Sequence, residues 1–115
     1  MRGARFDTGL LDPEDPFEID QDNQPHLYKH LPFGQGDRLV AVGVEELYDI
    51  YVTDRPLFYP GRDDGPADWL MVGEVPGLIL VVPLAPPRDQ DVSRCRPIGI
   101  YSASQQLRMR YLEER

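Results

Sequence analysis

His30 is the residue of this sequence best suited to proton transfer at neutral pH, because the pKa of a histidine side chain lies near that value. It follows Lys29, the one lysine among 12 basic residues, whose ammonium group can contact a phosphate. Each residue also has a structural alternative. His30 would interact with the last carbonyl groups of a helix, and Lys29 would be a solvated surface residue.

His26 and His30 are four positions apart, which on a helix would let both imidazoles bind one metal ion. The sequence lacks the glutamate that metalloproteases place between two such histidines. Asp20 and Asp22 offer oxygen ligands nearby, but they form no recognisable motif with the histidines. We therefore expect neither a metal site nor a cofactor.

A second group of candidate residues lies in the C-terminal quarter. Arg108 follows Ser104 and precedes Leu112 by four positions each, so helix geometry places the three in one line. Its guanidinium would stabilise the charge of a phosphate, or it would pair with a glutamate on the surface. Tyr111 would accompany it, or pack in the core with its hydroxyl at the rim.

Tyr101 and Arg96 complete the set of candidates, both as substrate-binding residues. Tyr101 could donate a hydrogen bond to a phosphate, or simply end a strand. Arg96 precedes Pro97, at the edge of an expected strand. An arginine suits two-pronged contacts with phosphate or carboxylate groups.

The chain is acidic, and its charge is unevenly distributed. It has 20 Asp and Glu against 12 Lys and Arg, a net charge of −8 over 115 residues. This excludes a protein that coats nucleic acid or anionic membrane with its whole surface. Residues 92–115, however, carry five arginines and two glutamates, a net charge of +3. A local basic site is therefore expected there.

The elements that must position these residues follow from periodicity and turn chemistry. Asp20 or Asp22 would cap a short helix over residues 23–30, which Pro25 limits at its start. Residues 38–42 suit a strand or a helix equally well. The remaining expectations are a strand over 17–19, a loop over 31–37, a helix over 45–52, a long loop over 53–67, strands over 69–72, 78–82 and 96–101, a turn at 74–77, and a last helix to Glu114 capped by Ser102 with Gln105.

This order predicts the α+β class: an antiparallel sheet with two N-terminal helices and a C-terminal helix. The length suits one domain. We expect an extended arm over residues 1–16, where Pro13 and Pro16 disfavour regular structure, and a single domain over residues 17–115.

Cys95 is the single cysteine, so it has no partner for an internal disulfide. The N-terminal residues lack the apolar core of a signal peptide, and the longest apolar run, residues 78–86, is too short to span a membrane. We therefore expect a soluble, cytoplasmic protein that does not associate with membranes.

Several short motifs together resemble BrnT-type toxins of type II toxin–antitoxin systems. In that family a strand ending in Trp-Asp precedes a helix with Asn or His and then Lys/Arg-His, and a second helix starts with Gly-Val-x-x-Glu-Glu. The matching segments here are Ile19 to His30, Gly43 to Leu47, Arg55 to Phe58, the expected hairpin over 69–82, and Ile100 to Ser104 followed by Arg108 and Tyr111. They occur in the family's order over most of residues 17–114.

The resemblance implies a RelE-like fold and a metal-independent endoribonuclease that inhibits translation. It also implies neutralisation by a DNA-binding antitoxin of ribbon-helix-helix type, with a homodimer or a heterotetramer as possible assemblies. His30 would act as acid or base, Arg108 and Lys29 would hold phosphate, and Tyr111 would accompany the basic residues of the last helix. RNA would be the substrate.

The sequence departs from the family in three places. An insertion lies within residues 31–44, Leu107 replaces a glutamate that often precedes the arginine, and Tyr101 replaces an arginine at the end of the last strand. The replacements at Leu107 and Tyr101 favour an alternative, a catalytically inactive BrnT-like module that binds a protein through its acidic surface and extra loop, whereas the family resemblance favours the toxin.

Overall fold

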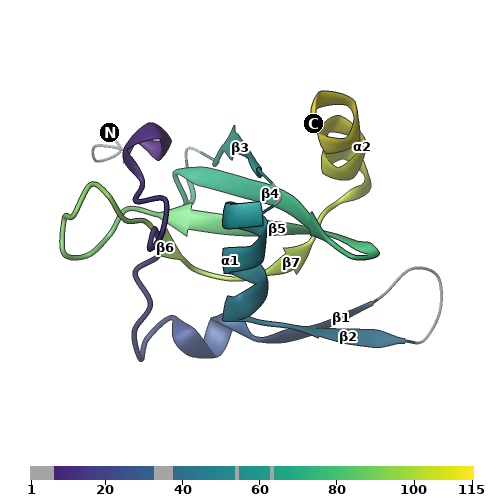
Figure 1. Ribbon diagram of the computed structural model, residues 1–115, viewed down its shortest axis with the longest axis horizontal. Helices are drawn as coiled ribbons and strands as arrows, with labels where there is room; N and C mark the ends of the chain where they lie inside the picture. The colour runs from purple at the N-terminus through teal and green to yellow at the C-terminus, as the bar shows by residue number, and fades with distance from the viewer. Residues whose placement is uncertain (1–6, 33–37, 54, 63) are drawn as a thin grey trace.

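The protein is described here from a computed structural model, which covers residues 7–32, 38–53, 55–62 and 64–115. Its centre is a five-stranded antiparallel sheet with the order β3-β4-β5-β6, in which β7 also pairs with β5. A separate two-stranded antiparallel sheet, β1-β2, lies below the larger sheet in Figure 1. The chain is therefore a mixed α+β protein with antiparallel sheets and two α-helices.

The strands and helices have the following bounds. The two-stranded sheet consists of β1 (Lys29–Pro32) and β2 (Leu39–Val42); the larger sheet consists of β3 (Leu57–Pro60), β4 (Trp69–Val75), β5 (Leu78–Ala85), β6 (Arg96–Pro97) and β7 (Tyr101–Ser102). The helices are α1 (Val44–Thr53) and α2 (Gln105–Glu114), and two short 3₁₀ helices span Thr8–Leu10 and Gln24–Leu27. In this described part of the chain, no helix is long and apolar enough to cross a membrane.

The β4–β5 hairpin forms the middle of the sheet, as its apolar sequence predicts. The two strands pair from Trp69 with Leu84 to Val75 with Leu78. Pro76 and Gly77 make the turn, and Gly77 has a φ of 81°. Pro followed by a glycine with positive φ is typical of a type II turn.

Alternating side chains of the hairpin build a core on each face of the sheet. Met71 and Leu80 pack with the α1 residues Leu47 and Ile50. On the other face, Val72 packs with Tyr111 of α2. The two helices thus pack against opposite faces of the sheet.

The predicted helix over residues 23–30 is wrong, and with it the arrangement of two N-terminal helices. Only the 3₁₀ helix Gln24–Leu27 forms, and Tyr28 already has the extended φ of −138°. Residues 29–32 instead pair with β2, from Lys29 with Val42 to Pro32 with Leu39. β1 begins at Lys29, so α1 is the single α-helix among the described residues before the large sheet.

Four smaller expectations are corrected or resolved. Residues 39–42 form a strand, so the alternative of a helix there is wrong. The expected loop over 53–67 contains β3, and the expected strand over 96–101 is divided into β6 and β7. Ser104, and not Ser102, caps α2 by accepting a hydrogen bond from the Leu107 N–H. Ser102 instead belongs to β7.

The segment around Phe17 is joined to the chain near β6. Phe17 and Cys95 form an isolated parallel bridge, where a longer strand over 17–19 was expected. The Cys95 N–H donates to Pro16 O and the Glu18 N–H donates to Cys95 O. Leu11, from the expected arm, is 7% exposed and belongs to the core. The boundary between residues 16 and 17 stays a prediction.

Candidate functional site

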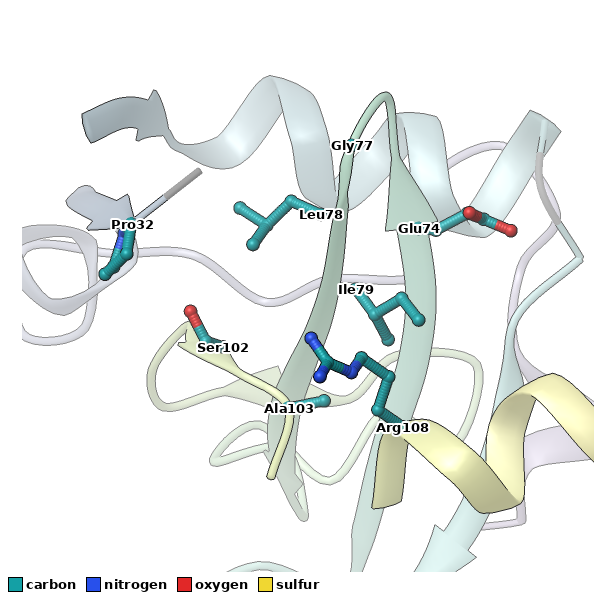
Figure 2. A pocket seen from close by; sticks show the side chains of 8 residues that line it. All are labelled: Pro32, Glu74, Gly77, Leu78, Ile79, Ser102, Ala103 and Arg108. Carbon is teal, nitrogen blue, oxygen red and sulfur yellow. The ribbon is translucent and has the colours of Figure 1, made fainter. Parts of the chain in front are cut away.

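A cavity of about 540 Å³ lies at the end of the large sheet, where β7 leads into α2. Its wall combines strand, turn and helix residues: Pro32, Glu74, Gly77, Leu78, Ile79, Ser102, Ala103 and Arg108. Figure 2 shows the Arg108 guanidinium reaching over Ile79 toward the space between Ser102 and Leu78, whereas Glu74 points away from it. The volume is within the range of small-ligand sites.

Arg108 reaches this cavity because of how α2 is anchored. Ser104 caps the helix, and Leu107 and Tyr111 pack against the sheet with Val72. The neighbouring position, Arg108, is thereby left exposed at the rim of the sheet. Within the described residues Arg108 has no ion-pair partner, so its charge is available to a ligand.

Lys29 and Tyr101 contact each other beside the cavity. The Lys29 Nζ lies 4.4 Å from the centroid of the Tyr101 ring, a cation–π distance. Tyr101 is 47% exposed. The strands that carry these two residues also supply Pro32 and Ser102 to the cavity wall. Three predicted site residues, from β1, β7 and α2, thus lie at or next to one end of the sheet.

His30 is exposed and is not part of the cavity wall. Its ring stands edge-on to that of Tyr28, with the centroids 5.5 Å apart. Because His30 lies within β1, the alternative of a helix-terminal histidine is wrong, and so is the premise that His26 and His30 share a helix face. Its role in proton transfer stays a prediction.

Arg96 is enclosed by carboxylates in the interior. Its side chain is 6% exposed, and Nη1 donates to Glu18 Oε1 at 2.9 Å and to Asp20 Oδ2 at 2.7 Å, while Nη2 donates to Asp20 Oδ1 at 2.9 Å. These hydrogen bonds hold the pKa of Asp20 well below its usual range. Arg96 therefore joins the N-terminal segment to β6, and it lies outside the cavity wall.

Tyr111 is 1% exposed and packs in the core between α2 and the sheet with Tyr59 and Val72. This position agrees with the packing alternative for the residue. The guanidinium carbon of Arg115 lies 6.0 Å from its ring centroid. Tyr111 is absent from the cavity wall, so its contribution to the site is to hold α2, and with it Arg108, against the sheet.

Sequence reasoning missed the apolar wall of the cavity and Ser102. Leu78 and Ile79 looked like central strand residues, and Ser102 looked like a helix cap. Ser104 was the feature of the sequence that could have corrected this, because it is a second serine able to cap the helix. With Ser104 as the cap, the helix begins at Gln105 and Ser102 belongs to β7.

Metal binding has no structural support in the part of the chain covered here. No three or more His, Cys, Asp and Glu side chains gather there in a group that could hold an ion.

No family model, curated protein or solved structure matches this chain. The resemblance to BrnT-type toxins therefore stays a prediction.

Proposed function

We propose that this chain is a BrnT-like, toxin-type protein that contacts RNA at the cavity, with Arg108 as the ligand of a phosphate. The observation that carries the proposal is the position of Arg108, which extends into a 540 Å³ cavity and has no ion-pair partner among the residues described. Arginine binds phosphate through paired N–H groups, and such charge-assisted hydrogen bonds are strong.

The other arginines of the basic C-terminal quarter support this choice, because each already has an acidic partner. Arg94 pairs with Asp15 at 3.7 Å, Arg96 with Glu18 and Asp20, Arg110 with Glu114 at 2.9 Å, and Arg115 with Glu74. The +3 charge of residues 92–115 thus leaves one arginine, Arg108, for an anionic ligand.

Lys29 and Tyr101 extend the contact beyond a single phosphate. The exposed aromatic ring offers a stacking surface for a base, and the lysine that now lies over it can turn to a neighbouring phosphate. Ser102 adds a hydroxyl to the cavity wall. The rest of the acidic surface repels RNA, so the proposed contact is short.

A second candidate function, a catalytically inactive BrnT-like module, is favoured by a separate observation. Metal-free RNA cleavage needs a base, a proton donor to the leaving oxygen and a cation. The cavity wall supplies the cation, but His30 is not part of it, and Arg96 is engaged in the interior. In this case the chain binds a partner, such as the antitoxin that the resemblance implies, without cleaving RNA.

The test measures binding of a fluorescently labelled single-stranded RNA by anisotropy. Arg108→Ala should weaken binding by about tenfold to a hundredfold, because a hydrogen bond to a charged group contributes about 1.5–3 kcal/mol. It should also reduce the slope of log K against log salt by about 0.7. The matched control is Arg110→Ala, whose guanidinium is held by Glu114 and lies over Tyr59. Equal losses in both variants, or no saturable binding by the wild type, would overturn the proposal.

Induced expression of the wild type and of His30→Ala distinguishes the two candidate functions. Induced expression of the wild type should arrest growth and degrade RNA if the chain is a nuclease, and His30→Ala should abolish both effects if His30 transfers a proton. RNA binding without growth arrest or cleavage identifies the inactive module. Full toxicity of His30→Ala contradicts the role predicted for that residue.

A further inference from the structure

The two-stranded sheet has an outer face that is apolar and exposed. In its register His30 faces Ala41 and Pro32 faces Leu39. All four of these residues are exposed, whereas the residues alternating with them are partly or fully buried. Tyr28, directly before β1, is 59% exposed and its ring contacts that of His30. We call Tyr28, His30, Pro32, Leu39 and Ala41 the outer face.

This composition is the reverse of what solvent exposure favours. A strand with one solvated face normally places polar residues on that face. Here Leu39 is 61% exposed, and the face carries no aspartate, glutamate, lysine or arginine. In Figure 1 the β1–β2 pair extends away from the large sheet. An exposed apolar patch of this kind marks an interaction surface.

An acidic cavity adjoins one end of the outer face. It has a volume of about 340 Å³ and is lined by Tyr28, Gly43, Val44, Glu45 and Glu46. Tyr28 therefore belongs to both features. The Glu46 carboxylate accepts a hydrogen bond from the Gly43 N–H at the start of α1, which fixes its position, and Glu45 is exposed.

The chemistry of this cavity is that of a cation site for a side chain. Two carboxylates attract an ammonium or a guanidinium, and the Tyr28 ring offers a cation–π contact. Arg38 lies at the opposite end of the outer face, next to Leu39. The face is thus polarised, with its acidic end at the start of α1 and its basic end at the start of β2.

We propose that the outer face is a docking surface for a different, basic protein, whose contacting segment carries apolar side chains followed by an arginine or lysine. The apolar side chains cover Leu39, Pro32 and Tyr28, and the cation enters the cavity between Tyr28 and Glu45. A second copy of this chain is the less favourable occupant, because two molecules of net charge −8 repel each other. Pro32 also lines the Arg108 cavity, so the two surfaces adjoin there, but this proposal does not depend on RNA contact at that cavity.

The experiment uses two synthetic probes, a fluorescein-labelled peptide of alternating leucine and arginine and a matched peptide of leucine and glutamate. Binding to the full chain is measured by anisotropy, and the site is mapped by backbone amide chemical shifts. The basic peptide should bind and shift the amides of β1, β2 and the start of α1. The acidic peptide should not bind.

Four exposed positions supply the variants and their controls. Leu39→Glu and Glu45→Lys should each weaken binding of the basic peptide by about tenfold, which corresponds to about 1.4 kcal/mol. Leu112→Glu and Glu113→Lys make the same changes of charge on α2, and they should alter binding less than twofold, within about 0.4 kcal/mol. Circular dichroism confirms that each variant is folded.

Several outcomes would overturn the proposal. Equal losses of affinity in Glu45→Lys and Glu113→Lys would show that the peptide is held by general charge attraction. If the basic peptide does not bind the wild type, the outer face is not a docking surface for a basic segment. A wild-type dimer in sedimentation that Leu39→Glu dissociates would identify a second copy as the occupant. Arg108→Ala should leave peptide binding unchanged, so a failure here and a failure of RNA binding are distinguishable.

Discussion

Arg96 shows how a residue suited to bind a substrate can be used by the fold itself. The sequence predicts a strand-edge arginine near a basic helix, which is a suitable phosphate ligand. In the structure its guanidinium makes three hydrogen bonds to Glu18 and Asp20, more than seventy positions away in the chain. A contact over such a separation depends on the path of the whole N-terminal segment.

We predict that Arg96→Met destabilises the protein by about 3 kcal/mol, because it leaves the buried Glu18 carboxylate and the more exposed Asp20 carboxylate without their cation. The free energy of unfolding in urea measures this effect. Arg88→Met is the matched control. Its ion pair with Asp22 is exposed at both ends, so the change should stay within about 1 kcal/mol. Similar losses in the two variants would contradict a special role for Arg96.

The same cluster predicts how stability depends on pH. Hydrogen bonds from Arg96 lower the pKa of Asp20. For Glu18, burial is the largest effect and raises the pKa, but the hydrogen bonds from the Arg88 N–H, the Arg96 guanidinium and the Asp89 N–H together lower it. Carboxylates with a lowered pKa stabilise the fold above their ordinary pKa of about 4, and this stabilisation is lost as the pH falls below that value.

We therefore expect the free energy of unfolding to decrease between about pH 5 and pH 2, and Asp20→Asn to decrease less steeply. Urea unfolding at several pH values checks this. Arg96→Met should flatten the curve in the same way, since it removes the cause of the shift. An Asp20→Asn curve parallel to that of the wild type would exclude the cluster as the source of acid sensitivity.

At the scale of elements, local sequence predicts the strands and turns that have a clear apolar or turn pattern, and it does not predict elements that form by pairing with a distant segment. The β4–β5 hairpin was predictable because its strands are continuously apolar and its turn is Pro-Gly. The segment from Gln24 to Pro32 was not, because its last four residues form a strand by pairing with Leu39–Val42. The residues of the segment itself do not indicate that it will pair with Leu39–Val42.

Gly73 of β4 lies against Ile50 of α1. A Cβ atom at this position would lie 2.2 Å from Ile50 Cγ2. We predict that Gly73→Ala destabilises the protein by about 1–3 kcal/mol, because either the helix or Ile50 must move. Gly65→Ala is the control, since its nearest neighbours lie at 3.7 Å, and it should change stability by less than about 0.5 kcal/mol. Thermal or urea unfolding distinguishes the two, and a neutral Gly73→Ala would show that α1 is loosely packed.

At the scale of the whole molecule, residues from the expected N-terminal arm contribute to the core. Leu11 is buried, the Asp12 N–H donates to Ser93 O, and the Tyr48 hydroxyl donates to Asp15 Oδ1 at 2.9 Å. We predict that a chain beginning at residue 17 is less stable than one beginning at residue 7, by about 2 kcal/mol for the lost burial of Leu11 alone. Leu11→Ala in the full chain should reproduce part of this loss. Equal unfolding midpoints for the two shortened chains would support the arm as a separate, dispensable segment.

The folded structure also shows which charges of the basic C-terminal quarter are already paired. The basic C-terminal quarter is a property of the sequence, but four of its five arginines are paired with acidic residues, one of them within α2 and the others across the fold. Only the folded chain identifies Arg108 as the cation that extends into the large cavity.

The sequence by itself determined the α+β class, the central hairpin, the last helix and the local excess of positive charge, because these depend on neighbours within a few positions. The tertiary structure decided which candidate residues meet. It placed Lys29 on Tyr101, put Arg108 in the cavity, enclosed Arg96 among carboxylates and left His30 outside the cavity wall. These outcomes depend on strand pairing and helix packing between distant segments, and no local pattern specifies such contacts.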